Sequence, residues 1–110
     1  MTLQEYLDKN FSREVQQISK FFFAGEKELT SLENEGHLIN LRELNVRSNN
    51  LKSLKGIEKI PNLEYIYIWD NPLEDISDLK DLKYLKKINS SKTSIPERYH
   101  QFLNEKEYIN

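Results

Sequence analysis

The sequence predicts an α/β fold, a short solenoid of about four turns in which each turn adds one strand to a parallel sheet and helices cover both ends. Three observations lead to this prediction. Apolar residues recur with a 22-residue period through the middle of the chain. Within each repeat they alternate with polar or aromatic residues, as in a strand with one buried face. Helix-start signals stand before and after the repeats.

The repeats begin at Leu41, Leu63 and Leu85, which defines the 22-residue period. One such strand cannot bury its apolar face alone, but stacked turns pair their strands and bury a continuous apolar column. An asparagine, Asn49 or Asn71, follows the strand in the first two repeats. Its side-chain amide can both donate to and accept from backbone groups, so we expect a structural role at the corner of the turn. The inward strand positions are then Leu44, Val46, Ile66, Ile68 and Ile88.

Two segments, Leu41–Leu51 and Leu63–Leu73, read LRELNVRSNNL and LEYIYIWDNPL. Both fit L-x-x-L-x-L-x-x-N-x-L, which resembles the leucine-rich repeat family, in particular its short 22-residue class of internalin-like and phosphatase-regulatory-type repeats. The resemblance covers residues 38–95. It implies a right-handed leucine-rich-repeat solenoid with a parallel sheet on the concave side and extended or 3₁₀ segments on the convex side.

The pattern weakens at both ends, where we expect helical caps. Thr2 and Glu5 match a capping box that opens a short helix, and Ser12 is placed to begin a second one. Ser94 precedes a helix-start signal that predicts a helix from about Pro96 to Lys106. The face expected to cover the last turn carries Tyr99, Phe102 and Leu103. We therefore expect one domain over residues 1–110, with an N-terminal helical cap (1–20), repeats (21–95) and a C-terminal helical cap (96–110).

The register of the first turn is open at this stage. In strict 22-residue register Phe22 and Ala24 point inward, whereas a shift by one residue points Phe21 and Phe23 inward. In either case one of Phe21, Phe22 or Phe23 is expected to extend the outward surface by one turn, and at least one of them belongs to the core.

The outward strand positions are where we expect function, because the inward ones are committed to packing. Tyr65, Tyr67 and Trp69 stand side by side on one strand, and Trp69 is the only tryptophan of the chain. An uncovered apolar patch of this kind is typical of a binding surface, and tyrosine, tryptophan and arginine are enriched at binding hot spots. The predicted partner-binding residues are Tyr65, Tyr67, Trp69, Arg47, Glu43, Asn45, Asp70, Lys87 and Asn89.

Composition excludes most catalytic chemistry. The chain has no cysteine and only two histidines, His37 and His100, far apart in sequence, so we expect no metal site, no cofactor and no enzyme activity. The net charge is −2, so no global field favours nucleic acid or anionic lipid. The longest apolar run, Phe21–Ala24, is far too short to span a membrane, and the first residues lack the features of a signal peptide. We expect a cytoplasmic protein.

The sequence thus predicts a non-catalytic protein-binding module, an adaptor, inhibitor or immunity-type protein that recognises a protein partner through its concave face. Three alternatives stay open. The same patch can pair two copies of the chain in a homodimer. A lysine-rich stretch near Lys83–Lys92 is the basis for nucleic-acid binding, the less favoured alternative. Finally, aromatic residues favour strands even where no partner binds.

Overall fold

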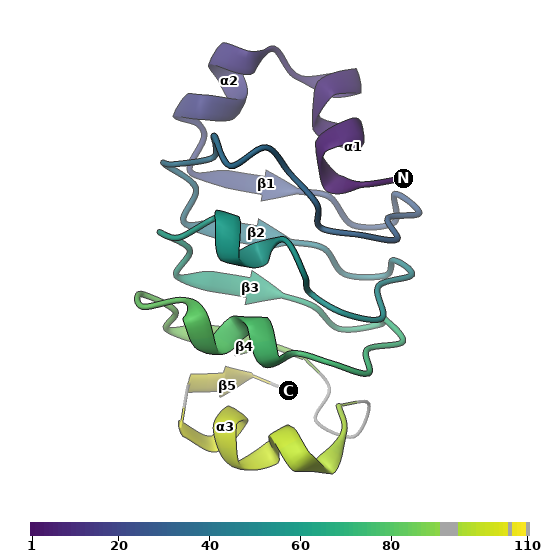
Figure 1. Cartoon of the computed structure of the whole chain (residues 1–110), viewed down its shortest axis with the longest axis vertical. Coiled ribbons are helices and arrows are strands. Elements are labelled where there is room, and N and C mark those ends of the chain that lie inside the picture. Colours follow the sequence, from purple (N-terminus) through teal and green to yellow (C-terminus); the bar gives the residue numbers. More distant parts are fainter. Residues whose placement is uncertain (91–94, 106, 110) are drawn as a thin grey trace.

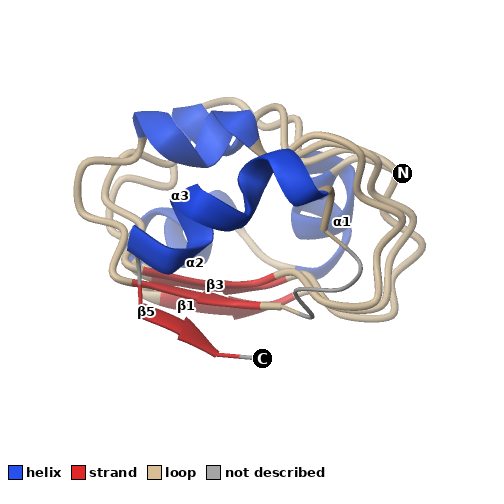
Figure 2. Cartoon of the chain, turned by 90° about the horizontal axis from the view of Figure 1, so that it is seen from below, coloured by secondary structure: helices blue, strands red, loops and turns tan. Residues whose placement is uncertain are grey.

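The structure, a computed structural model, describes residues 1–90, 95–105 and 107–109 of the chain. Its centre is a parallel sheet whose strands follow one another in chain order (Figure 1). Viewed along the stack, the helices lie on one side of this sheet (Figure 2). The predicted α/β repeat fold with a parallel sheet is confirmed. The strands are β1 (Phe21–Phe23), β2 (Glu43–Asn45), β3 (Tyr65–Tyr67), β4 (Lys87–Asn89) and β5 (Glu107–Ile109).

The strand register reproduces the sequence period. Phe21 pairs with Glu43, Glu43 with Tyr65 and Tyr65 with Lys87, so that each step matches the 22-residue period. Lys87 in turn pairs with Glu107, a step that falls short of the period. The region predicted as the C-terminal cap thus contains, after its helix, a strand at residues 107–109 that the sequence did not indicate. The chain returns after its last helix and pairs its backbone with β4, whose hydrogen-bonding groups would otherwise be left at an open edge.

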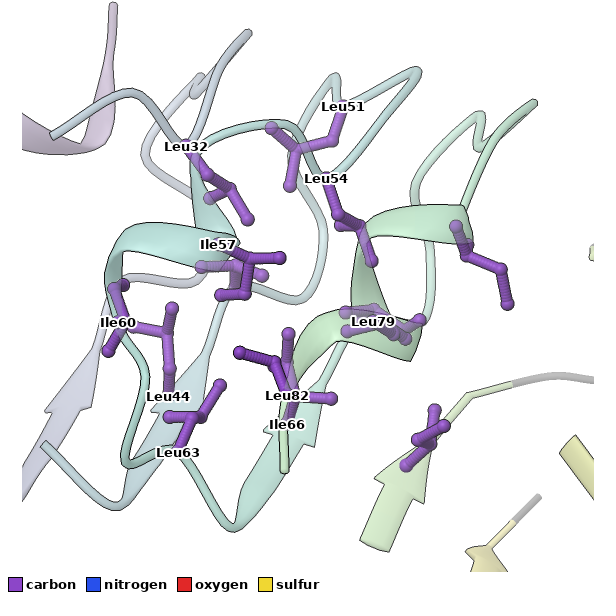
Figure 3. Close-up of a cluster of buried hydrophobic side chains, with 14 of the residues drawn as sticks. Leu32, Leu44, Leu51, Leu54, Ile57, Ile60, Leu63, Ile66, Leu79 and Leu82 are labelled. Carbon is purple, nitrogen blue, oxygen red and sulfur yellow. The ribbon is translucent and has the colours of Figure 1, made fainter. Parts of the chain in front are cut away.

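The core lies between the strands and the opposite side of each turn. On that side lie the 3₁₀ helices η1 (Ile57–Lys59) and η2 (Ser77–Asp81), in agreement with what the family resemblance implies. Figure 3 shows the buried side chains of these helices and of the strands gathered in one cluster. Leu44 and Ile57 are completely buried, and Ile66 is 1% exposed. Full burial of such a side chain contributes about 1.5–3 kcal/mol, so the apolar column is the main source of stability.

The first strand keeps the strict 22-residue register. Phe22 is 4% exposed and Ala24 is fully buried, whereas Phe21 and Phe23 are 48% and 39% exposed. Phe22 pairs with Leu44, which is itself an inward residue. The alternative register is thereby excluded, and both flanking phenylalanines lie on the outward face of the sheet.

Two short helices, α1 (Leu3–Asn10) and α2 (Arg13–Ile18), lie beside β1 at one end of the stack (Figure 1). Thr2 and Glu5 form the predicted capping box, and the Ser12 side chain accepts a hydrogen bond from the backbone N–H of Val15. Leu3 and Leu7 of α1 are fully buried. In α2 the apolar residues Val15 and Ile18 are 40% and 70% exposed, and the buried residue is Gln16.

At the other end of the stack η4 (Glu97–Tyr99) leads into α3 (His100–Glu105). The proposed N-cap, Ser94, lies outside the described residues, and Pro96 precedes η4 without a side-chain cap. Tyr99 and Leu103 are buried and Phe102 packs against the same cluster, which confirms the predicted apolar face.

Asp75 links this end to the preceding turn. Its Oδ1 accepts hydrogen bonds from the backbone N–H of Ser77 and from the Tyr99 hydroxyl, both at 2.8 Å. Hydrogen bonds from Ser77 and then from Tyr99 lower the pKa of Asp75 to about 2, since they favour its charged form. The ionised carboxylate therefore helps to fix the position of Tyr99.

The corner asparagines have the predicted structural role. The Asn49 side chain accepts hydrogen bonds from the N–H groups of Lys27 and Leu29, both at 3.0 Å. It donates to the carbonyls of Ala24 at 2.9 Å, of Val46 at 2.8 Å and of Arg47 at 3.2 Å. Asn71 makes the same type of contacts one turn later, accepting from Leu51 N–H at 3.1 Å. Each asparagine thus joins its own turn to the preceding one.

Candidate functional site

The candidate site is the outward face of the sheet, on the side away from the helices (Figure 2). Along β2, β3 and β4 the middle residue is buried and its two neighbours are partly exposed, so alternate side chains belong to this open face. Because successive turns are in register, the outward residues form rows that run across the strands. The described rows are Phe21–Glu43–Tyr65–Lys87, Phe23–Asn45–Tyr67–Asn89 and Gly25–Arg47–Trp69.

The three aromatic residues predicted for the site lie together on this face. Tyr65 and Tyr67 are half-buried by their neighbours in the sheet, and Trp69 is 38% exposed. No helix in the described part of the chain covers the face (Figure 2). Phe21 and Phe23, from β1, add two further exposed rings. The exposed rings therefore stand on β1 and on β3, on either side of the polar outward residues Glu43 and Asn45 of β2.

Arg47 lies between two aromatic rings of the open face. The guanidinium carbon is 5.5 Å from the centre of the Phe23 ring and 5.4 Å from that of the Trp69 ring. Phe23 comes from β1 and Trp69 follows β3, so the arginine is flanked from both neighbouring turns. A cation stacked on an exposed aromatic ring gains roughly 0.5–1 kcal/mol. We call Phe23, Arg47 and Trp69 the arginine clamp.

Gly25 provides the room in which the arginine clamp forms. A Cβ atom at this position would lie 2.8 Å from Cζ of the Phe23 ring and 3.0 Å from Cγ of Arg47. Both distances are shorter than ordinary van der Waals contact. The missing side chain at Gly25 thus lets the Phe23 ring and the stem of Arg47 approach each other in the row next to Trp69.

A hydrogen bond fixes the position of the Tyr67 side chain. The Tyr67 hydroxyl donates a hydrogen bond of 3.1 Å to Oε1 of Glu43, one strand away. Burial, followed by the hydrogen bond and negative charge of Glu43, raises the pKa of Tyr67 above its usual value. The phenol is therefore neutral at physiological pH, and Glu43 holds the ring in one orientation.

The remaining predicted residues lie around this centre. Asn45 accepts a hydrogen bond of 3.1 Å from the backbone N–H of Arg47, and thereby fixes the start of the turn. Lys87 and Asn89 are half-buried on β4, beside the tyrosines. Asp70 is exposed at the rim, next to Trp69.

The rim has an unusual backbone conformation. Glu26, Ser48 and Asp70, which occupy equivalent positions in successive turns, have φ angles of 58°, 55° and 59°. This left-handed conformation costs a residue other than glycine roughly 1–2 kcal/mol. In each turn the left-handed residue directly follows the row Gly25–Arg47–Trp69, where the chain leaves the sheet.

Sequence reasoning missed Phe23 and Gly25 as specific site residues. The run of three phenylalanines was the available signal, but its two registers could not be separated without the strand pairing. Gly25 carried no signal, since its contribution depends on how neighbouring side chains lean over it.

The two histidines and Lys86 contact other parts of the chain. His37 Nε2 lies 2.8 Å from Gln16 Oε1, and His100 Nε2 lies 3.0 Å from the carbonyl of Ile95. Within the described ranges, histidine and carboxylate side chains form no group of three suited to a metal ion. Lys86, from the lysine-rich stretch, pairs with Glu64 at 2.9 Å. Every helix in these ranges is too short or too polar to cross a membrane.

Comparison with known proteins agrees with this architecture. Residues 39–89, which include β2, β3 and β4, match a family model described as Leucine Rich repeats (2 copies). These residues therefore carry leucine-rich repeats. Domains of this family commonly mediate protein–protein interactions and are typically non-catalytic scaffolds. A search of curated proteins gave no match to the chain.

Proposed function

We propose that this chain is a non-catalytic binding module, an adaptor, inhibitor or immunity-type protein that holds a protein partner on the open face of its sheet. The observation that carries the proposal is the group of exposed aromatic rings around the arginine clamp. Large aromatic surfaces and arginine are enriched at interface hot spots, and an uncovered apolar patch of this kind is uncommon on a monomer. The proposed contact residues are Tyr65, Tyr67, Trp69, Arg47, Glu43, Asn45, Asp70, Lys87 and Asn89.

The aromatic residues are well suited to this role because they are already ordered. Tyr67 is held by Glu43, and Trp69 is stacked on Arg47. A side chain that is fixed before binding loses less conformational entropy when the partner docks. The charged groups at the edges, Asp70 and Lys87, then select the orientation of the partner.

The finer architecture belongs to the same proposal. We propose a single domain in which the stack is a right-handed solenoid over residues 21–95. The helices α1 and α2 cap one end of it, and α3 caps the other. We also propose that the protein acts in the cytoplasm.

The test is an affinity pull-down from cells of the source organism with the wild type and a Tyr67→Ala, Trp69→Ala double variant. Loss of a hot-spot residue lowers binding by about 2 kcal/mol or more, so a true partner is retained by the wild type and lost by the double variant. Tyr84→Ala is the matched control, because Tyr84 is 58% exposed but lies outside the open face. Retention of the same proteins by all three chains would refute the proposal.

Self-association through the same patch is the second candidate, because the exposed rings also suit a two-fold contact between copies. Light scattering over a range of concentrations distinguishes it. A dimer that Trp69→Ala dissociates favours self-association, and a monomer at high concentration excludes it.

A further inference from the structure

We infer that the arginine clamp is a carboxylate-binding site, and that the partner presents an aspartate or glutamate side chain to Arg47. This inference rests on the proposed function, because it assigns the chemistry of the partner that docks on the open face. The observation that supports it is that, in the part of the chain that the structure describes, the Arg47 guanidinium lacks the oxygen partner that the other arginines have.

Every other arginine of the chain has an oxygen partner within the described residues. Arg13 bonds to Glu35 and Asp8, and Arg42 pairs with Glu64 at 3.5 Å. Arg98 donates to the carbonyl of Glu74. For Arg47 the described part of the chain supplies neither an ion pair nor a hydrogen bond to the guanidinium.

The nitrogen atoms of Arg47 differ in their access to solvent. Nε is buried and has no hydrogen-bond partner in the described structure, whereas the two Nη atoms are not among the buried, unpartnered atoms. The rings of Phe23 and Trp69 lie against the guanidinium from the two neighbouring turns. The Nη atoms are therefore the guanidinium nitrogens that solvent, and so a ligand, can reach.

A carboxylate fits these nitrogen atoms. Two parallel N–H groups match the two oxygens of a carboxylate in a bidentate pair, which is among the strongest hydrogen-bonded contacts. Stacking between rings fixes the arginine beforehand, so less rotamer entropy is lost on binding. Excluding water around the pair strengthens the attraction further, because the surrounding rings lower the local dielectric constant.

The local charge favours a singly charged anion over a phosphate. Phosphate recognition by proteins commonly uses clusters of arginine residues. The row Gly25–Arg47–Trp69 contains one cation, Arg47, and its rim carries the acidic Glu26 and Asp70. A carboxylate pairs with this single positive charge, whereas a dianion would place more negative charge beside Glu26 and Asp70.

The experiment uses the full chain and a random peptide library displayed on phage. Peptides are selected on the wild type, and those still recovered on Trp69→Ala are discarded. We expect the remaining peptides to share an aspartate or glutamate at one position. Selection on Arg47→Glu should instead give lysine or arginine at that position.

A double-mutant cycle then measures the pair. Replacing the shared acidic residue of a synthetic peptide by its amide should weaken binding to the wild type about tenfold or more, because a hydrogen bond to a charged group is lost. The same peptide change should weaken binding to Arg47→Met less than about twofold, since the charge is already absent. Arg42→Met is the matched control and should behave as the wild type. Thermal unfolding checks that the variants fold, and Arg47→Gln, which also removes the charge, replaces Arg47→Met if the latter does not fold.

The outcomes separate the two proposals. Trp69-dependent peptides without a shared acidic position, or equal losses in both arms of the cycle, would overturn the carboxylate site and leave the binding face in place. Tighter binding when phosphoserine replaces the acidic residue would overturn it in favour of a phosphate site. If no Trp69-dependent peptide is recovered, both the site and the proposed function fail.

Discussion

Asn49→Ala should lower the free energy of unfolding by about 2–4 kcal/mol, because it removes a side chain that joins two turns. The replacement leaves the N–H groups of Lys27 and Leu29 and the carbonyl of Ala24 without this partner. The other two carbonyls keep a partner each, since Val46 also accepts from Asn71 and Arg47 also accepts from the Glu26 N–H. An unsatisfied buried group costs about 1–3 kcal/mol, and the part-buried Lys27 N–H costs less because water can reach it.

Urea denaturation followed by far-UV circular dichroism measures this effect. With a slope of about 2 kcal/mol per molar urea, the expected loss moves the midpoint by roughly 1–2 M. Asn50→Ala is the matched control, because Asn50 is exposed and should change stability by less than about 0.5 kcal/mol.

Asn49→Asp separates the two functions of the amide. The carboxylate still accepts from the two N–H groups, but it cannot donate to the three carbonyls and it places a charge beside them. It should therefore be at least as destabilising as alanine at neutral pH. If Asn49→Ala unfolds at the same urea concentration as Asn50→Ala, the assigned role of the corner asparagine is incorrect.

Three further predictions test other parts of the structure. Ile66→Ala should destabilise the fold by roughly 2–5 kcal/mol, and Trp69→Ala by much less, since Ile66 is 1% exposed and Trp69 is 38% exposed. The opposite ranking in urea would show that the faces of the sheet are assigned incorrectly. Because the pKa of Asp75 is lowered to about 2, its stabilisation is present above the unfolded value near 4 and is lost as pH falls towards 2. The acid limb of a plot of stability against pH should therefore be shallower for Asp75→Asn, and an unchanged limb would contradict the assignment. Gly25→Ala should clearly weaken partner binding and change the melting temperature little, because the added Cβ meets the side chains of the arginine clamp. An unchanged affinity for the partner by calorimetry would refute this.

The fold was predictable to the extent that the 22-residue period set the register. Leu44, Ile66 and Ile88 lie side by side in the sheet because their spacing matches one turn of the stack. The fifth strand was not predictable in this way, since the pairing of Glu107 with Lys87 falls outside the period. Helix α2 was located by Ser12, but so short a helix does not show in its sequence which of its faces is buried.

For the site, alternation along the strands predicted which residues face outward, but it did not predict their contacts. Arg47 and Trp69 are 22 residues apart, so the register places them side by side, and the guanidinium carbon lies 5.4 Å from the centre of the Trp69 ring. The approach of Phe23 from the opposite turn depended on a strand whose register the sequence left open. Contacts made by long side chains over a glycine require the three-dimensional arrangement.

The left-handed residues at the rim couple thermal stability to the binding surface, because replacing them by glycine would raise stability and also change that surface. Glycine at Glu26, Ser48 or Asp70 would relieve a conformational penalty of about 1 kcal/mol or more at each place. Each such replacement would also delete a charged or hydroxyl group that borders the sheet. An engineered variant with three glycines would thus tolerate higher temperatures while presenting a smoother and less discriminating edge.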